Sequence, residues 1–156
     1  LDAEAILLIE VDGMEVGLDE QRDRVAEICR QHNAREVRFA ADAKERLGKP
    51  YIWGGGHRRW KSKGYDCSGA VSYVLHAAGL LSRPLVSGLL ATSWGAPGLG
   101  AWITVYANRA HTYAVIAGLR FDTSAVGESL NQGRGPRWRT TVRSGTGYAA
   151  RYYPGY

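Results

Sequence analysis

A cysteine, a histidine and an aspartate lie along the chain at positions that could support nucleophilic catalysis. Cys67 opens the segment CSGAVSYVLHAAGLL, while His111 and Asp122 belong to the later segments HTYAVIA and LRFDT. A cysteine nucleophile needs a base beside it, and that base needs a polar group to orient it. The sequence therefore predicts a thiol site made of these three side chains, provided that the fold brings them together.

The segment that begins at Cys67 has the pattern of a buried helix. Asp66 stands at the N-cap position and Gly79 where the helix should end. The positive end of the helix dipole favours a thiolate, which is the nucleophilic form of cysteine. A structural cysteine would fit the same buried face of the helix equally well. The choice between a structural and a nucleophilic role therefore depends on whether a base and its orienting group lie beside Cys67. The residues of the stripe are Cys67, Ala70, Val71, Val74, Leu75 and Ala78.

The histidine and the aspartate fall on two segments that predict neighbouring strands. Residues 102–106, 111–117 and 119–123 read as strands, and Gly118 joins the last two. An antiparallel pair folded at Gly118 would bring its two outer ends together. His111 opens one strand and Asp122 lies near the end of the next, so an imidazole is expected beside a carboxylate.

Charge divides the chain unevenly. Residues 1–46 hold 12 Asp/Glu and 7 Lys/Arg, whereas residues 47–156 hold 3 Asp/Glu and 13 Lys/Arg, a balance of −5 against +10. A basic domain favours anionic partners such as nucleic acid, acidic lipid or an anionic wall polymer. Arginines interleaved with Trp138 are a weak nucleic-acid signal. A cationic surface suited to wall polymer fits better, so no nucleic acid is expected.

The first 39 residues predict a small βαβ extension. Residues 5–11 and 35–39 read as strands, and residues 18–32 have helical composition, with acids at the start and basic residues at the end. Cys29 falls on the apolar face of that helix and is expected to be a buried packing thiol. A second short helix is expected over residues 40–47, before Gly48 and Pro50.

Several classes of feature are not expected in this sequence. No apolar run approaches the roughly 20 residues that span a bilayer. The acidic start LDAEAILLIEVDG lacks the pattern of a signal peptide. No HExxH motif or paired cysteine spacing occurs, so no metal site is expected. Cys29 and Cys67 are too few for a disulfide framework.

The N-terminal segment resembles the C-terminal cap region of FAD-linked oxidases of the glycolate oxidase type. The strings LLIEVDG and RVAEICRQHNAREVRFAAD carry this resemblance over roughly residues 4–45. The flavin-binding domain of that family has no counterpart here, so flavin binding is not carried over and no cofactor is expected. A fused fragment that serves as an extension is the preferred interpretation.

Residues 40–156 resemble the NlpC/P60 cysteine peptidases. The matching strings are LGKPYIWGGG, YDCSGAVSYVLHAAGLL and AHTYAVIAGLRFDTS, and the tail resembles the secreted actinobacterial branch. The resemblance implies an α+β fold with a papain-like core, in which a nucleophile helix packs on an antiparallel sheet. It implies Cys67 as nucleophile and His111 as base. The family's third residue is usually His, Asn or Gln; here Asp122 or Thr123 occupies that neighbourhood, and Asp122 is preferred because a carboxylate stabilises the charged imidazole.

The resemblance also implies residues that contact the substrate. Tyr51 matches a tyrosine beside the nucleophile that could assist the oxyanion, and the backbone N–H of Cys67 could donate there too. Asp66 and Ser68 match positions that bind the free amino end of the stem peptide, although Asp66 could equally serve only as a helix cap. His57, which follows the glycine run, is expected to be an exposed loop histidine.

These observations predict a hydrolase of the bacterial cell wall, a thiol peptidase that cuts an amide bond of the peptidoglycan stem peptide. By resemblance it would act outside the cell or at the wall, on anionic wall material. The alternatives are a non-catalytic wall-binding module, favoured if Asp122 points away from His111, and an amidase or acyltransferase of the same fold. A flavin-oxidase fragment is the remote alternative, and a yellow chromophore would indicate it.

Overall fold

The chain divides into two units, residues 1–41 and 42–156. The strands expected at 5–11 and 35–39 and the helix expected at 40–47 lie outside the described residues, so the βαβ extension remains a prediction. The boundary expected after residue 39 likewise falls outside them. The computed structural model describes residues 18–31, 49–126, 135–139, 141 and 143–155.

The first unit contains helix α1, Leu18–Gln31, which confirms the helix expected at 18–32 up to its last described residue. Glu27 accepts a hydrogen bond from the Gln31 amide one turn later, at 3.1 Å. Cys29 is only partly buried, and its neighbour Ile28 is 48% exposed. The expectation that Cys29 is a fully buried packing thiol is therefore wrong, because this face of the helix is partly open to solvent.

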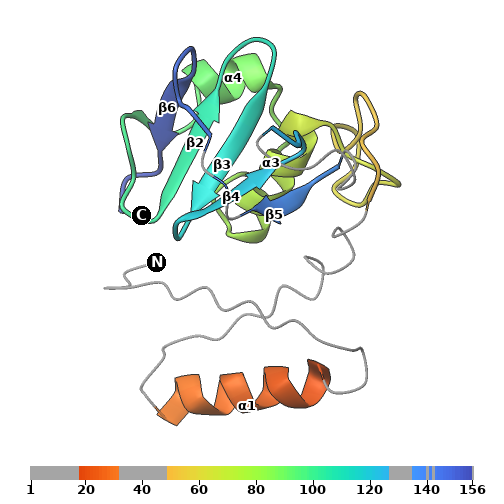
Figure 1. The fold of residues 1–156 in the computed structure, drawn as a ribbon, viewed down its shortest axis with the longest axis vertical. Helices are drawn as coiled ribbons and strands as arrows, with labels where there is room; N and C mark the ends of the chain where they lie inside the picture. Colours follow the sequence, from red (N-terminus) through yellow and green to blue (C-terminus); the bar gives the residue numbers. More distant parts are fainter. Residues whose placement is uncertain (1–17, 32–48, 127–134, 140, 142, 156) are drawn as a thin grey trace. The chain divides into compact units, whose positions relative to one another are not determined.

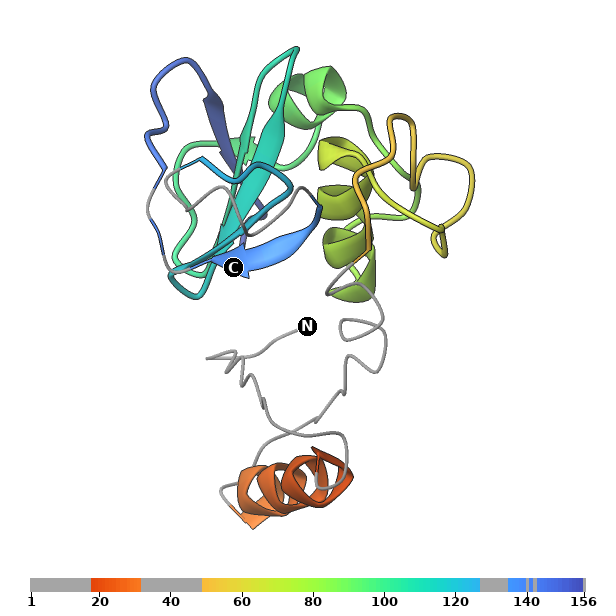
Figure 2. The ribbon, with the colours of Figure 1, turned by 45° about the vertical axis from the view of Figure 1, so that its right-hand side comes forward.

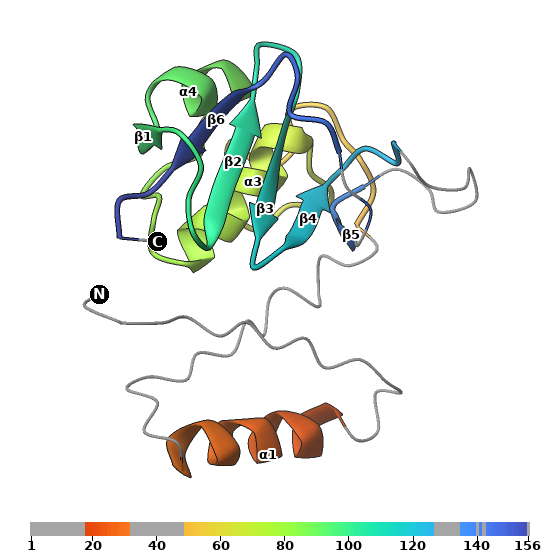
Figure 3. The same cartoon turned by 60° about the vertical axis from the view of Figure 1, so that its left-hand side comes forward.

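The second unit has an α+β fold, with helices packed on an antiparallel sheet (Figures 1 and 3). Its six strands follow the order β1-β6-β2-β3-β4-β5, and every neighbouring pair is antiparallel. The helices are α3, Cys67–Ala77, and α4, Ser87–Thr92. The strands are β1, Ala96–Pro97; β2, Ile103–Ala107; β3, Thr112–Ile116; β4, Leu119–Asp122; β5, Arg137–Arg139; and β6, Ala149–Tyr152.

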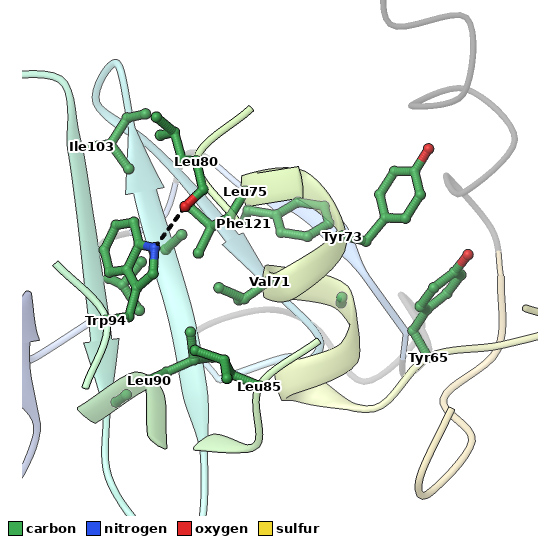
Figure 4. Close-up of a cluster of buried hydrophobic side chains, with 14 residues drawn as sticks. Tyr65, Val71, Tyr73, Leu75, Leu80, Leu85, Leu90, Trp94, Ile103 and Phe121 are labelled. Carbon is green, nitrogen blue, oxygen red and sulfur yellow. Dashed lines mark hydrogen bonds between the residues drawn. The ribbon is translucent and has the colours of Figure 1, made fainter. Parts of the chain in front are cut away.

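The hydrophobic core lies between the helices and the sheet. Helix α3 contacts β3 and β4, α4 contacts β2 and β6, and the two helices contact each other (Figure 2). Apolar side chains from α3, α4, β2, β3 and β4 interdigitate, and the indole N–H of Trp94 donates to the carbonyl oxygen of Leu80 at 3.2 Å (Figure 4). The core thus fixes the start of α3 relative to the ends of the strands. Within the described parts of the chain, no helix is long and apolar enough to cross a membrane.

Helix α3 forms as its sequence predicts. The Asp66 side chain caps it by accepting the Gly69 backbone N–H at 2.7 Å. Cys67 and three further members of the predicted stripe are buried, and Val74 is partly buried. Ala78 is exposed instead, because the helix has already ended and Ala78 is its C-cap.

The hairpin of β3 and β4 forms over the segments that alternate in the sequence, although both strands are a little shorter than expected. Ala114 pairs with Phe121 and Ile116 with Leu119. The two turn residues, Ala117 and Gly118, have φ values of 49° and 83°, which the twist of a two-residue hairpin requires. This turn sets the start of β3 and the end of β4 at the same edge of the sheet.

Candidate active site

His111 and Asp122 meet at the edge defined by this hairpin. The Nε2 atom of His111 lies 2.8 Å from Oδ1 of Asp122. The Asp122 side chain is fully buried, whereas 19% of the His111 side chain is exposed. Because an ionised carboxylate only accepts hydrogen bonds, Nε2 carries the proton of this bond and Nδ1 is left to face another group.

Asp122 is surrounded by donors on both carboxylate oxygens. Its Oδ1 also accepts the Ser124 backbone N–H at 2.8 Å, and its Oδ2 accepts a guanidinium N–H of Arg143 at 2.9 Å. Arg120 lies at 3.6 Å from Oδ2. Burial alone would raise the pKa of Asp122, but the hydrogen bonds from His111 and Ser124 and the charges of His111 and Arg143 outweigh it and lower the pKa.

Cys67 is the third member of the site. It is the first residue of α3, is 7% exposed, and its thiol is close enough to His111 to contribute to the raised pKa of that imidazole. Burial alone would lower the pKa of His111, but the hydrogen bonds and charges of Asp122 and Cys67 outweigh it and raise that pKa to about 9. This raised pKa favours the protonated imidazole at neutral pH, the form in which His111 can donate a proton.

The three side chains form a row in the order nucleophile, base and orienting group. The thiol stands at the positive end of a helix of 11 residues, the imidazole stands between thiol and carboxylate, and the carboxylate is anchored in the sheet. Such a row can form a carbon–sulfur bond and pass a proton to a leaving group.

Asp66 forms a second polar cluster at the start of α3. Besides the Gly69 N–H it accepts the Gly54 N–H at 3.0 Å and the Ser68 hydroxyl at 3.2 Å. His57 Nε2 lies 3.0 Å from Oδ1 of Asp66. Burial alone would raise the pKa of Asp66, but the hydrogen bond of His57 and the backbone N–H of Gly69 are the main causes that lower it. Asp66 is thus a helix cap that also holds the glycine loop.

The expectation that His57 is an exposed loop histidine is wrong. Only 20% of its side chain is exposed, and Nε2 contacts Ser68 Oγ at 3.1 Å as well as Asp66. Both contacts use the same ring nitrogen, whereas the histidine of a catalytic triad takes a proton through one ring nitrogen while a carboxylate holds the other, so this cluster is not arranged as a triad.

The remaining predicted residues are Tyr51, which lies in the loop region before α3, and Thr123, which directly follows β4. Tyr51 pairs with Tyr65 in an isolated parallel bridge, and Tyr65 stands two residues before Cys67. Thr123 is buried and its carbonyl oxygen accepts the Gly135 N–H at 3.3 Å. Of Asp122 and Thr123, it is Asp122 whose side chain is bonded to His111.

Two further residues belong to the site but carry no local signal in the sequence. Arg143 and Tyr148 lie more than 20 residues after Asp122, in a glycine-containing segment without regular periodicity. The contact of Arg143 with Asp122 and that of Tyr148 with Arg143 come from the tertiary fold alone. In the sequence, Arg143 reads only as part of a cationic surface.

No group of three or more His, Cys, Asp or Glu side chains that could hold a metal ion occurs among the described residues. Comparison with known proteins finds no matching family model, no matching curated protein and no matching solved structure.

Proposed function

We propose that residues 40–156 form a cysteine peptidase that cleaves an amide bond in the peptide stem of peptidoglycan. The observation that carries this proposal is the 2.8 Å hydrogen bond between His111 and the buried Asp122 carboxylate, beside a Cys67 thiol that helps to raise the pKa of His111. The substrate class comes from the resemblance to NlpC/P60 peptidases, and we infer the papain-like arrangement of the core on the same basis.

The proposed reaction begins with the Cys67 thiolate and the protonated His111. The sulfur attacks the amide carbonyl carbon, a carbon–sulfur bond forms, and negative charge collects on the carbonyl oxygen. The Cys67 backbone N–H, at the positive end of α3, and the Tyr51 hydroxyl are the proposed donors to this oxygen.

His111 then donates its proton to the amide nitrogen, the carbon–nitrogen bond breaks, and the amine leaves a thioester on Cys67. The neutral imidazole next takes a proton from water, and the resulting hydroxide attacks the thioester. The carbon–sulfur bond breaks, the carboxylic acid is released, and the thiolate and the imidazolium are restored. Asp122 holds the ring in one tautomer and stabilises its charged form throughout.

The charge of the domain supports a wall substrate. Residues 47–156 carry a formal balance of +10, which attracts anionic polymers at long range. A location outside the cell or at the wall follows from this proposal.

The alternative, a non-catalytic wall-binding module, is favoured if Asp122 points away from His111. The two side chains are hydrogen bonded. We therefore favour the catalytic proposal, and an amidase or acyltransferase would use the same three side chains on another substrate.

The proposal is tested by digesting purified peptidoglycan and identifying the products by mass spectrometry. The wild-type chain should release stem-peptide fragments, and Cys67→Ala should lower their rate of release by about 10³-fold or more. Cys29→Ala, the same change at the other cysteine, is the matched control and should digest as the wild type does. Fragments from Cys67→Ala at the wild-type rate would refute the thiol mechanism. No fragments from a folded wild-type chain would favour the binding module or another amide substrate.

A further inference from the structure

Arg143 is held at both ends of its guanidinium group. One terminal nitrogen donates to Oδ2 of Asp122 at 2.9 Å, and the other donates to the Tyr148 hydroxyl at 2.7 Å. Its guanidinium carbon also lies 5.3 Å from the ring centre of Tyr113 and 5.4 Å from that of Tyr148. Only 16% of the Arg143 side chain is exposed. These contacts hold the Arg143 guanidinium group in a single orientation relative to the Asp122 carboxylate.

The two oxygens of Asp122 therefore have separate tasks. Oδ1 faces His111 and the Ser124 N–H, whereas Oδ2 faces the Arg143 guanidinium. Rotation of the carboxylate would break both sets of bonds. Tyr148, the anchor of Arg143, also borders the imidazole directly, with its ring in an edge contact 6.5 Å from that of His111.

We propose that Arg143, anchored by Tyr148, is a positioning residue that holds Asp122 with Oδ1 toward His111 and sets the pH range in which the Cys67–His111 pair is reactive. The inference rests on the proposed function, because it assigns a role within the same thiol site. It brings the segment of residues 143–148 into the catalytic machinery, beside the helix and the hairpin.

The direction of the expected effect follows from the charges around Asp122. The groups that face it are His111 from the start of β3, Arg120 from β4, Arg139 from β5, whose Nε lies 3.3 Å from the Asp122 carbonyl oxygen, and Arg143. Removing one of these cations makes the surroundings of the imidazolium more negative. The imidazolium should then keep its proton to a higher pH.

The test is the rate of alkylation of Cys67 by iodoacetamide as a function of pH, with the labelled site identified by mass spectrometry. In a Cys–His pair the rate rises once as the thiolate–imidazolium pair forms and again as the imidazolium loses its proton. In Arg143→Met the second step should move up by about half a pH unit. Arg143→Lys keeps the charge but loses the two-ended bond, so its steps should stay in place while its rate at pH 7 falls about threefold.

Tyr148→Phe removes only the anchoring hydroxyl and should resemble Arg143→Lys. Arg151→Met is the matched charge control, because Arg151 donates to the carbonyl oxygens of Trp94 and Gly95 and makes no contact with Asp122 in the described residues. Its profile should match the wild type.

Each outcome decides the inference. If folded Arg143→Met shows both rises of the alkylation rate at the same pH values as the wild type, the role of Arg143 is overturned. The proposed function is then left intact. If Arg143→Met does not fold, wild-type rates in both Arg143→Lys and Tyr148→Phe would overturn it instead. A single ordinary thiol step in the wild type would overturn the thiol mechanism, and the inference with it.

Discussion

The buried charge of Asp122 dominates the site at the scale of single residues. A carboxylate without exposed surface is costly unless cations and hydrogen-bond donors surround it, and His111, Arg143 and Arg120 supply them. Loss of the carboxylate would leave the buried Arg120 and the partly buried Arg143 without the anion beside them. The same group that orients the imidazole is therefore also a main support of this edge of the sheet.

This pairing should make stability depend on pH in a defined window. The raised pKa of His111, about 9, contributes stability that is complete below its ordinary value of 6.5 and is lost as the pH rises toward 9. The lowered pKa of Asp122 contributes stability above its ordinary value of 3.8, which is lost as the pH falls below it. We expect the thermal midpoint to be highest between about pH 4 and 6.5.

Asp122→Asn should reduce the fall of the thermal midpoint at both acidic and alkaline pH. It should also lower the free energy of unfolding at pH 5.5 by about 2–4 kcal/mol. The measurement is thermal unfolding from pH 3 to 10. Asp23→Asn, at an exposed aspartate of α1, is the control and should keep the wild-type curve. An Asp122→Asn curve with the wild-type shape would show that another pair governs the pH dependence.

At the scale of elements, the start of α3 is held by the glycine loop before it. The Asp66 N–H donates to the Gly55 carbonyl oxygen at 3.2 Å, and the Asp66 side chain accepts the Gly54 N–H. A Cβ atom on Gly69 would overlap the Gly55 carbonyl oxygen, so loop and helix are in direct backbone contact. The position of Cys67 thus depends on a close approach that only glycine permits.

Gly69→Ala should therefore destabilise the domain by about 2 kcal/mol or more, because two backbone segments must move apart. Gly88 is the matched control, since it lies in helix α4 with open space around its α-carbon. Gly88→Ala should be neutral or stabilising by up to about 1 kcal/mol. Urea unfolding followed by tryptophan fluorescence measures both. Equal effects of the two substitutions would refute the close-approach argument.

At the scale of the whole molecule, every described element of the candidate site belongs to the second unit. The sheet, the core and the row of Cys67, His111 and Asp122 all lie within residues 42–156. The first unit holds the acidic part of the chain and one described helix. The role of the N-terminal segment as an extension of the domain that holds this site stays a prediction.

Deletion of residues 1–41 should accordingly leave the domain folded and Cys67 as reactive as in the full chain. Far-UV circular dichroism reports the fold, and the pH profile of alkylation reports the site. A shortened chain that does not fold would show instead that the N-terminal segment is integral to the domain. A folded chain with a changed profile would place part of that segment at the active site.

Some of the architecture could be predicted from the sequence because local rules govern it. Helix α3 follows from its apolar spacing and the Asp66 cap, and the β2–β3–β4 strands follow from alternation and the turn at Gly118. Helix α4 and strands β1, β5 and β6 escaped prediction. They are short, and two to six residues show too little periodicity to indicate a structure.

The sequence by itself determined which residues could act as nucleophile, base and orienting group, because cap, stripe and hairpin signals act over a few residues. Only the tertiary structure decided that Arg143 holds Asp122 and that His57 joins Asp66. The first contact joins a loop arginine to the end of β4, 21 positions away, and the second joins a loop histidine to the cap of α3, 9 positions away. Burial of a charge depends on everything packed around it, and no local spacing records that.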